Sequence, residues 1–142
     1  MEDALRAAQE AEGAGEVPVG AVIVLNGEII ASAGNRVERD QDPSAHAEML
    51  AIRAATAKIG SKWLSDCDLY VTLEPCPMCA GAISLARLRR VYYGAADPKS
   101  GGVDHGPRVF AQPTCHHAPE VIAGVEESRC GELLRQFFAQ RR

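Results

Sequence analysis

The amino-acid sequence predicts one α/β domain over residues 1–142, in which helices cover a central mixed sheet. Three observations lead to this prediction. A chain of 142 residues that is 46% hydrophobic is long enough for one core but too short for two ordinary domains. Asn26-Gly27 lies between two apolar runs, which strongly indicates an antiparallel hairpin. Further along the chain, β-branched or aromatic runs alternate with segments of helical periodicity, which is typical of α/β proteins.

The first half of the chain is expected to contain a helix, the hairpin and a second helix. Alanines and charged residues recur at helical spacing over 2–12, and glycines follow. The hairpin strands are expected at 17–25 and 28–31. Asp42-Pro43 has the pattern of an N-cap followed by proline at the first helical position, so the second helix is expected from about Pro43 to Ala57.

The second half is expected to hold three strands, two helices and one long loop. In chain order these are a strand at 67–73, a helix at 77–88, a strand at 90–94, a loop at 95–118, a strand at 120–125 and a helix at 127–140. The first of these strands is β-branched and aromatic and is therefore expected to be buried. The loop holds most of the late glycines and prolines and only weak periodicity, which favours a functional role.

Composition and charge restrict the compartment and the partners. No apolar run approaches the roughly 20 residues of a membrane span, and the charged start lacks a signal-peptide pattern. We therefore expect a soluble, cytoplasmic protein without a membrane partner. Five cysteines, an odd number, argue against a disulfide framework and favour metal binding. The net charge of -4 means that any nucleic acid must be held by a local basic patch, and a DNA partner is not expected.

Two short motifs supply the side chains of a catalytic zinc site. His46-Ala47-Glu48 contributes an imidazole and a carboxylate, and Cys76-Pro77-Met78-Cys79 contributes two thiols. Cysteines at i and i+3 share one side of a helix, and the positive helix start favours their thiolate form. A catalytic zinc ion takes three protein ligands and leaves the fourth position open to water. We therefore expect His46, Cys76 and Cys79 to hold zinc.

Glu48 is expected to remain off the metal and to move protons. Positions two apart point in nearly opposite directions on an ideal helix, so Glu48 should approach the site from a different side than His46. A free glutamate can take a proton from water and give it to a leaving amine, as hydrolytic deamination requires. Two other interpretations remain open: a structural zinc site closed by Cys67, Cys115, His116 or His117, and a redox C-x-x-C pair.

Several segments resemble the zinc-dependent cytidine deaminase superfamily and, within it, the bacterial tRNA adenosine deaminases. The similar segments are 16–22, 34–36, 42–48, 70–82 and 94–102. The resemblance implies a three-layer α/β/α cytidine deaminase-like fold with a central five-stranded mixed sheet. It also implies a homodimer with one zinc ion per subunit. The implied reaction is hydrolysis of adenosine to inosine at the wobble position of tRNA anticodons, which is an RNA modification.

The resemblance also implies residue roles, which we carry over position by position. His46, Cys76 and Cys79 would bind zinc, Glu48 would shuttle protons, Asn35 would hydrogen-bond the flipped base, Asp97 and Lys99 would contact the anticodon backbone, and Phe138 and Arg141 would touch RNA from the last helix. The helix at 77–88 would lie in the dimer interface. The chain departs from the family at His116-His117, where Asn-His is usual, so one RNA contact is not carried over.

Each RNA-contact residue also has a plain structural interpretation. Asn35 could be only a turn residue, Asp97 and Lys99 could form a solvated turn, and Phe138 could be an ordinary surface residue. Two alternative functions stay open beside tRNA deamination. One is a deaminase of a free nucleobase or nucleoside, of guanine or cytosine type, with the same zinc chemistry. The other is a zinc-stabilised RNA-binding module without activity, in which Glu48 would have no role.

Overall fold

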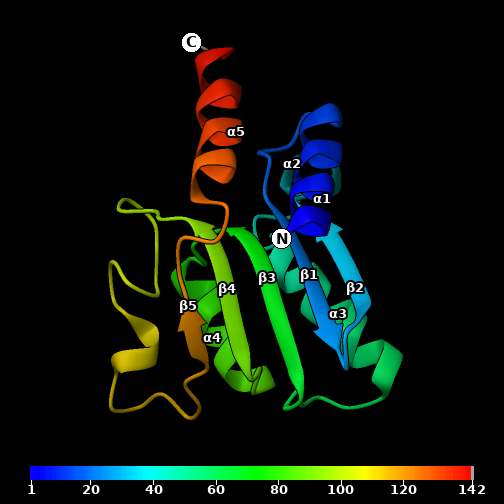
Figure 1. Ribbon diagram of the computed structural model, residues 1–142, viewed down its shortest axis with the longest axis vertical. Coiled ribbons are helices and arrows are strands. Elements are labelled where there is room, and N and C mark those ends of the chain that lie inside the picture. Colours follow the sequence, from blue (N-terminus) through cyan, green and yellow to red (C-terminus); the bar gives the residue numbers. More distant parts are fainter. Residues whose placement is uncertain (142) are drawn as a thin grey trace.

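A twisted five-stranded sheet forms the centre of the computed structural model, which describes residues 1–141 (Figure 1). The strand order is β2-β1-β3-β4-β5. The strands are β1 (Gly20–Leu25), β2 (Glu28–Gly34), β3 (Cys67–Leu73), β4 (Arg90–Ala95) and β5 (Glu120–Ile122). β1 runs antiparallel to both β2 and β3, whereas β3, β4 and β5 are parallel. The sheet is therefore mixed, as the sequence predicted.

The predicted hairpin joins β1 to β2. Asn26 and Gly27 both adopt positive φ angles, of 51° and 79°. These are the angles of a two-residue turn whose twist matches that of the flanking strands, and asparagine and glycine tolerate them best. One register shift, between Ile23 and Val24, interrupts the pairing with β2.

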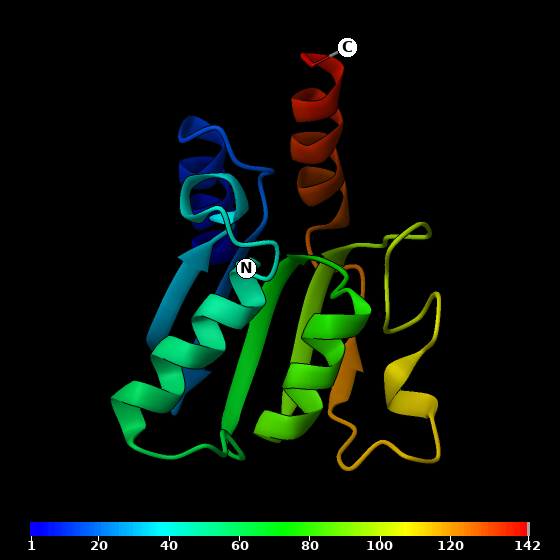
Figure 2. The ribbon, with the colours of Figure 1, turned by 180° about the vertical axis from the view of Figure 1, so that it is seen from behind.

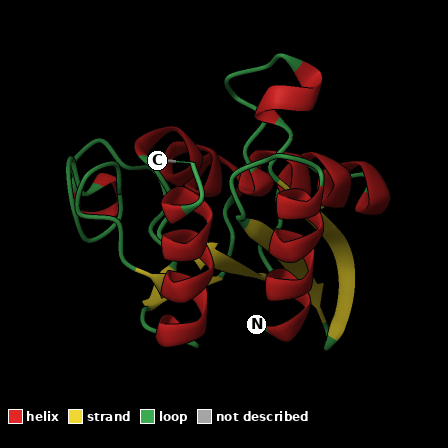
Figure 3. Cartoon of the chain, turned by 90° about the horizontal axis from the view of Figure 1, so that it is seen from above, coloured by secondary structure: helices red, strands yellow, loops and turns green. Residues whose placement is uncertain are grey.

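Helices lie on both sides of the sheet. They are α1 (Glu2–Gly13), α2 (Val37–Asp40), α3 (Ala47–Ile59), α4 (Pro77–Ala86) and α5 (Glu127–Ala139), with a 3-10 turn η1 (Val109–Ala111). Figure 2 shows α3 and α4 side by side across one face, where they enclose the core around Ile23, Leu69 and Val91. α1 and α5 lie on the other side and extend past one end of the sheet (Figures 1 and 3). This arrangement is the expected three-layer α/β/α architecture.

Glycines allow α1 and α5 to approach the strands. A Cβ atom at Gly20 in β1 would lie 2.0 Å from the carbonyl oxygen of Ala4 in α1. A Cβ atom at Gly94 in β4 would lie 2.3 Å from Sγ of Cys130 in α5. Neither position can accept a side chain without moving the helix, so these glycines set the spacing of the outer layer.

The start of the second long helix was predicted incorrectly. α3 begins at Ala47 rather than at Pro43. Oδ1 of Asp42 accepts hydrogen bonds from the backbone N–H and the hydroxyl of Ser44, so Asp42 closes a local turn instead of capping the helix. The short helix α2 was not anticipated, β2 extends to Gly34, and β5 ends at Ile122. β1 begins at Gly20, three residues later than predicted, and the remaining helices and strands lie within two residues of their expected bounds.

Two further expectations concern the cysteines and the membrane. All five cysteines are free thiols, so the fold contains no disulfide bond. Within residues 1–141, the helices are too short or too polar to cross a bilayer.

Candidate metal centre and active site

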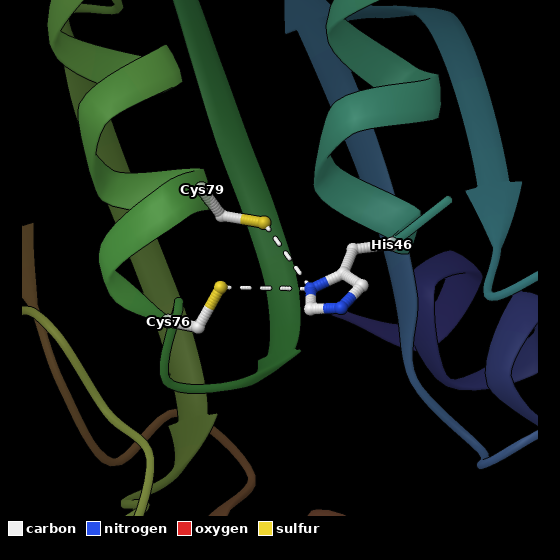
Figure 4. A group of neighbouring side chains, drawn as sticks. All are labelled: His46, Cys76 and Cys79. Carbon is white, nitrogen blue, oxygen red and sulfur yellow. Dashed lines mark hydrogen bonds between the residues drawn. The ribbon is translucent and has the colours of Figure 1, made fainter. Parts of the chain in front are cut away.

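Three side chains that are far apart in the sequence converge between the starts of α3 and α4 (Figure 4). His46 is the N-cap residue of α3, Cys76 is the N-cap residue of α4, and Cys79 lies in the first turn of α4. Both sulfur atoms lie 3.5 Å from Nδ1 of His46. The three donor atoms all lie within 4.8 Å of one another. The structure thus brings together the three residues that the sequence singled out as zinc ligands.

The local sequence explains why these donors face each other. Pro77 occupies the first turn of α4, where its fixed φ favours helix initiation and its missing N–H has no cost. Cys76 stays extended just before the helix, with φ -70° and ψ 171°, and Cys79 follows three residues later. The positive ends of both helices meet at the cluster, which favours thiolates there.

The thiols and the imidazole are electrostatically coupled. Hydrogen bonding from the Cys79 thiol and from His46 lowers the pKa of Cys76 to about 4. The hydrogen bond to Cys76 and burial together raise the pKa of Cys79. The hydrogen bond to Cys76 also raises the pKa of His46. Cys79 is fully buried, whereas His46 and Cys76 are half-buried, so the cluster is open on one side.

One nitrogen and two sulfur donors are a donor set that zinc prefers. Among residues 1–141, no fourth histidine, cysteine or carboxylate belongs to the group. Cys115, one of the possible closing ligands, instead lies 3.4 Å from the hydroxyl of Ser84. The three residues therefore fit a zinc ion that keeps an open position, which is the arrangement of a catalytic site rather than a structural one.

Glu48 lies in the first turn of α3, beside the metal ligands but outside their group. Its side chain is 4% exposed. Burial raises the pKa of Glu48 to about 7, and its nearby charged and polar groups include His46 and the Cys79 thiol. A carboxyl group of this kind can hold and release a proton near neutral pH, as proton transfer in catalysis requires.

Asn35 lies at the same edge of the site and has a structural role there. Its Oδ1 accepts a hydrogen bond of 2.8 Å from the backbone N–H of Ala47, the first residue of α3. Asn35 thus satisfies one of the free N–H groups at the start of this helix, which His46 does not cap with its side chain. Its amide NH₂ group is left for other partners.

The predicted RNA-contact residues lie in two different regions. Oδ1 of Asp97 accepts hydrogen bonds from the backbone N–H groups of Lys99 and Ser100, which forms a local turn after β4. Lys99 is exposed on that turn. Their contacts with RNA stay a prediction.

Phe138 lies in the last turn of α5, and Arg141 lies two residues beyond its end at Ala139. This helix projects away from the sheet (Figure 1). Phe138 is 48% exposed and meets Phe137 edge to face. The guanidinium of Arg141 stacks over the Phe137 ring, with its Cζ atom 3.6 Å from the ring centroid. The structure does not bring these two residues to the metal ligands, and their contacts with RNA also stay a prediction.

Sequence reasoning did not identify two buried glutamates that accept hydrogen bonds from distant segments of the chain. Glu74 follows β3 and accepts hydrogen bonds from the segment 97–105. Glu16 precedes β1 and accepts hydrogen bonds from the backbone N–H groups of Glu38 and Arg39. In the sequence, each appears only as a glutamate next to an apolar strand. The residues that donate hydrogen bonds to it lie more than 20 positions away, so its role could not be predicted.

Comparisons with known proteins agree with this geometry. The sequence model of the family described as "Cytidine and deoxycytidylate deaminase zinc-binding region" matches residues 1–95, which include all three predicted ligands. A tRNA-specific adenosine deaminase from Agrobacterium fabrum is 56% identical over 142 residues, covering 100% of this chain and 93% of that protein.

Two solved structures are also similar. One comes from a study of A-to-I editing by tRNA:A34 deaminases at the wobble position of transfer RNA. It has a TM-score of 0.93 and 56% identity, and the match covers 94% of this chain and 97% of that one. The other is a guanine deaminase from Bacillus subtilis, with a TM-score of 0.67 and 37% identity over 99% of this chain and 90% of that one. The chain therefore belongs to the zinc-binding cytidine and deoxycytidylate deaminase family.

Proposed function

We propose that this protein is a zinc-dependent hydrolase that deaminates adenosine to inosine at the wobble position of tRNA anticodons. The observation that carries the proposal is the His46–Cys76–Cys79 cluster with the buried Glu48 beside it. The full-length similarity to tRNA-specific adenosine deaminases supports the choice of substrate. The net reaction consumes one water molecule and releases one ammonia molecule for each adenosine.

His46, Cys76 and Cys79 would hold the zinc ion, one per subunit. When bound, zinc supplies the Lewis acidity that makes water a nucleophile near neutral pH. The protein contributes the geometry, because two helix starts fix the three donors on one side and leave the other side open. The low pKa of Cys76 favours the thiolate that a metal requires.

Glu48 would act as the general base and then as the general acid. As the base it removes a proton from the attacking water, and as the acid it delivers a proton to the departing amino group. Its burial excludes bulk water and keeps its pKa near 7, so that both steps are accessible at neutral pH. This role explains why a carboxyl group is buried here without joining the metal.

Asn35 would hydrogen-bond the flipped base through the amide group that its helix-capping contact leaves free. Asp97 and Lys99 would contact the anticodon backbone from the turn after β4. Phe138 and Arg141 would touch RNA from α5, where an exposed aromatic ring can stack on a base. No comparable surface is proposed for DNA.

We further propose that the protein is a homodimer that pairs through α4. Met78 and Leu85 are 38% and 67% exposed, and they lie seven residues apart on one side of this helix, with Ala82 between them. An exposed apolar stripe of this kind favours a protein interface. Sedimentation equilibrium checks the dimer, and Leu85→Lys is expected to shift it toward monomer.

The domain organisation and the compartment complete the proposal. The sheet and the main core draw on elements from β1 to β5, which supports one domain over residues 1–142. A tRNA substrate supports a cytoplasmic location.

One experiment tests the substrate. The zinc-loaded protein is incubated in parallel with an anticodon stem-loop carrying an unpaired wobble adenosine and with free adenosine, guanine and cytidine, and inosine and ammonia are measured. Deamination of the stem-loop adenosine is expected. Ammonia release from guanine or cytidine with none from the stem-loop would instead assign the protein to free-base or nucleoside deamination.

A further inference from the structure

Glu74 is the most heavily hydrogen-bonded carboxylate near the metal centre. It follows β3 directly, precedes Cys76 by two residues and is 2% exposed. Its Oε1 atom accepts from Asp97 N at 3.0 Å and pairs with His105 Nδ1 at 2.7 Å, and its Oε2 atom accepts from Val103 N at 3.2 Å, Asp104 N at 3.0 Å and His105 N at 3.2 Å. All five donors belong to one segment, residues 97–105, which we call the 97–105 loop.

The 97–105 loop is also packed against the strand-to-helix turn that carries Cys76. The backbone N–H of Gly102 donates to the carbonyl oxygen of Pro75 at 2.8 Å. A Cβ atom at Gly102 would lie 2.5 Å from the Pro77 nitrogen, and one at Gly101 would lie 2.4 Å from Oε2 of Glu74. The loop, the Glu74 carboxylate and the metal-ligating turn are therefore in direct contact, with no room for a side chain between them.

Interior carboxylates are costly unless hydrogen bonds compensate for lost hydration. The donors that compensate Glu74 lie at both ends of the 97–105 loop, at Asp97 and at 103–105. One rigid side chain thus fixes the two ends relative to each other. The exposed turn between them, which carries Lys99, takes its position from this carboxylate.

We propose that Glu74 is a positioning residue for RNA binding, which acts by fixing the 97–105 loop beside the metal centre. This inference rests on the proposed function, because the loop carries Asp97 and Lys99. Glu74 does not touch the reacting atoms. Its loss is therefore expected to weaken binding of the stem-loop while the chemical step and the zinc content persist.

Glu74→Gln is the informative variant, because it keeps the shape and replaces one acceptor oxygen by an NH₂ group. That group cannot accept from the N–H of Asp97 or from those of 103–105, so one end of the loop loses its anchor. Asp68→Asn is the matched control. Asp68 is a carboxylate in β3, 8% exposed, that pairs with Arg89 at the end of the strand opposite to Glu74.

The measurements are zinc content, hydrogen exchange of the backbone amides in the zinc-loaded protein, and KM and kcat on the stem-loop. For Glu74→Gln we expect faster exchange in the 97–105 loop, a KM raised about tenfold, kcat within about twofold and unchanged zinc. Asp68→Asn should leave KM and loop exchange at wild-type values. His105→Ala, which removes the ring nitrogen paired with Oε1 of Glu74 and keeps the backbone N–H, should raise KM by a smaller factor.

Three outcomes would overturn the inference. They are an unchanged KM and unchanged loop exchange in Glu74→Gln, an equal rise in KM in Asp68→Asn, and a loss of zinc in Glu74→Gln. If the wild-type protein does not deaminate the stem-loop, the proposed function fails first. The exchange measurement then still shows whether Glu74 holds the loop, so the two failures are distinguishable.

Discussion

Glu48 and Glu74 are both buried glutamates beside the metal centre, but their surroundings differ. Glu48 is 4% exposed and Glu74 is 2% exposed. Burial raises the pKa of Glu48 to about 7, because few donors compensate for its lost hydration. Burial also acts to raise the pKa of Glu74, but hydrogen bonds from Asp97, His105, Asp104 and Val103 lower it below its ordinary value. A buried carboxylate with few hydrogen-bond donors, such as Glu48, can therefore exchange protons near neutral pH. One with many donors, such as Glu74, stays ionised and fixes the segment that donates to it.

The largest expected effect is a loss of activity on replacing Glu48, the buried carboxylate that accepts few hydrogen bonds. Glu48→Gln should lower kcat on the stem-loop by about 10²–10⁴-fold, because an amide cannot accept and return a proton. The zinc content should stay at one ion per subunit, and the melting temperature should not fall, because the variant removes a buried ionisable group without removing a donor network. Inosine formation, metal analysis and thermal unfolding check these three values.

The same variant also tests whether Glu48 and Glu74 differ in role. If Glu48→Gln lowers the melting temperature as much as the same substitution at Glu74 does, Glu48 is a structural residue. If it keeps more than a tenth of wild-type activity, Glu48 is not the proton carrier.

Glu16 is a second buried carboxylate that accepts several hydrogen bonds. It is 1% exposed and accepts from the N–H groups of Glu38 and Arg39 and from the Arg39 guanidinium. Although burial acts to raise the pKa of Glu16, these hydrogen bonds lower it below 4.5. We expect Glu16→Gln to reduce the free energy of unfolding by about 1.5–3 kcal/mol near pH 7.

The pH dependence of this loss has a definite sign. A lowered folded-state pKa means that the stabilisation by Glu16 is fully present above the ordinary value of 4.5. It is lost as the pH falls through the lower, folded-state pKa. The stability difference between wild type and Glu16→Gln should therefore be constant from about pH 6 to 8 and shrink below about pH 4.5. Urea unfolding across this range checks it, and a gap that widens in acid would contradict the assigned shift.

The same contrast shows what the sequence could and could not predict. The grouping of His46, Cys76 and Cys79 was predicted because each of the two motifs is local: a C-x-x-C pair at one helix start, and H-x-E at another. The start of α3 was mispredicted because its first N–H is capped by Asn35, twelve residues away, while Asp42 closes its own turn. Glu74 was missed because its donors lie 23–31 residues further along the chain. Local sequence patterns thus predict the residues of the candidate site, whereas the long-range hydrogen bonds that position them cannot be read from the sequence.

Asn35 combines a structural and a proposed substrate role, and two variants separate them. Asn35→Ala removes the acceptor for Ala47 N–H and should cost about 1 kcal/mol of stability, as other helix-cap losses do. Asn35→Asp keeps the acceptor and should remain within about 0.5 kcal/mol of wild type, because a carboxylate at a helix start is favourable. Both variants should raise KM for the stem-loop, because both lack the amide NH₂. Wild-type KM in Asn35→Asp would restrict Asn35 to capping.

The smallest expected effect is on RNA binding by Lys99, which lies in the 97–105 loop that Glu74 holds in place. If Lys99 contacts one phosphate, Lys99→Ala should lower the slope of log K against log salt by about 1, weaken binding a few-fold at moderate salt and leave kcat unchanged. Lys58→Ala is the matched control, because Lys58 is also exposed but lies in the last turn of α3. That end of α3 lies at the opposite end of the sheet from the turn after β4 (Figure 2). An unchanged slope in Lys99→Ala, or an equal change in Lys58→Ala, would show that the loop presents no phosphate contact. Glu74 would then support the metal-ligating turn alone.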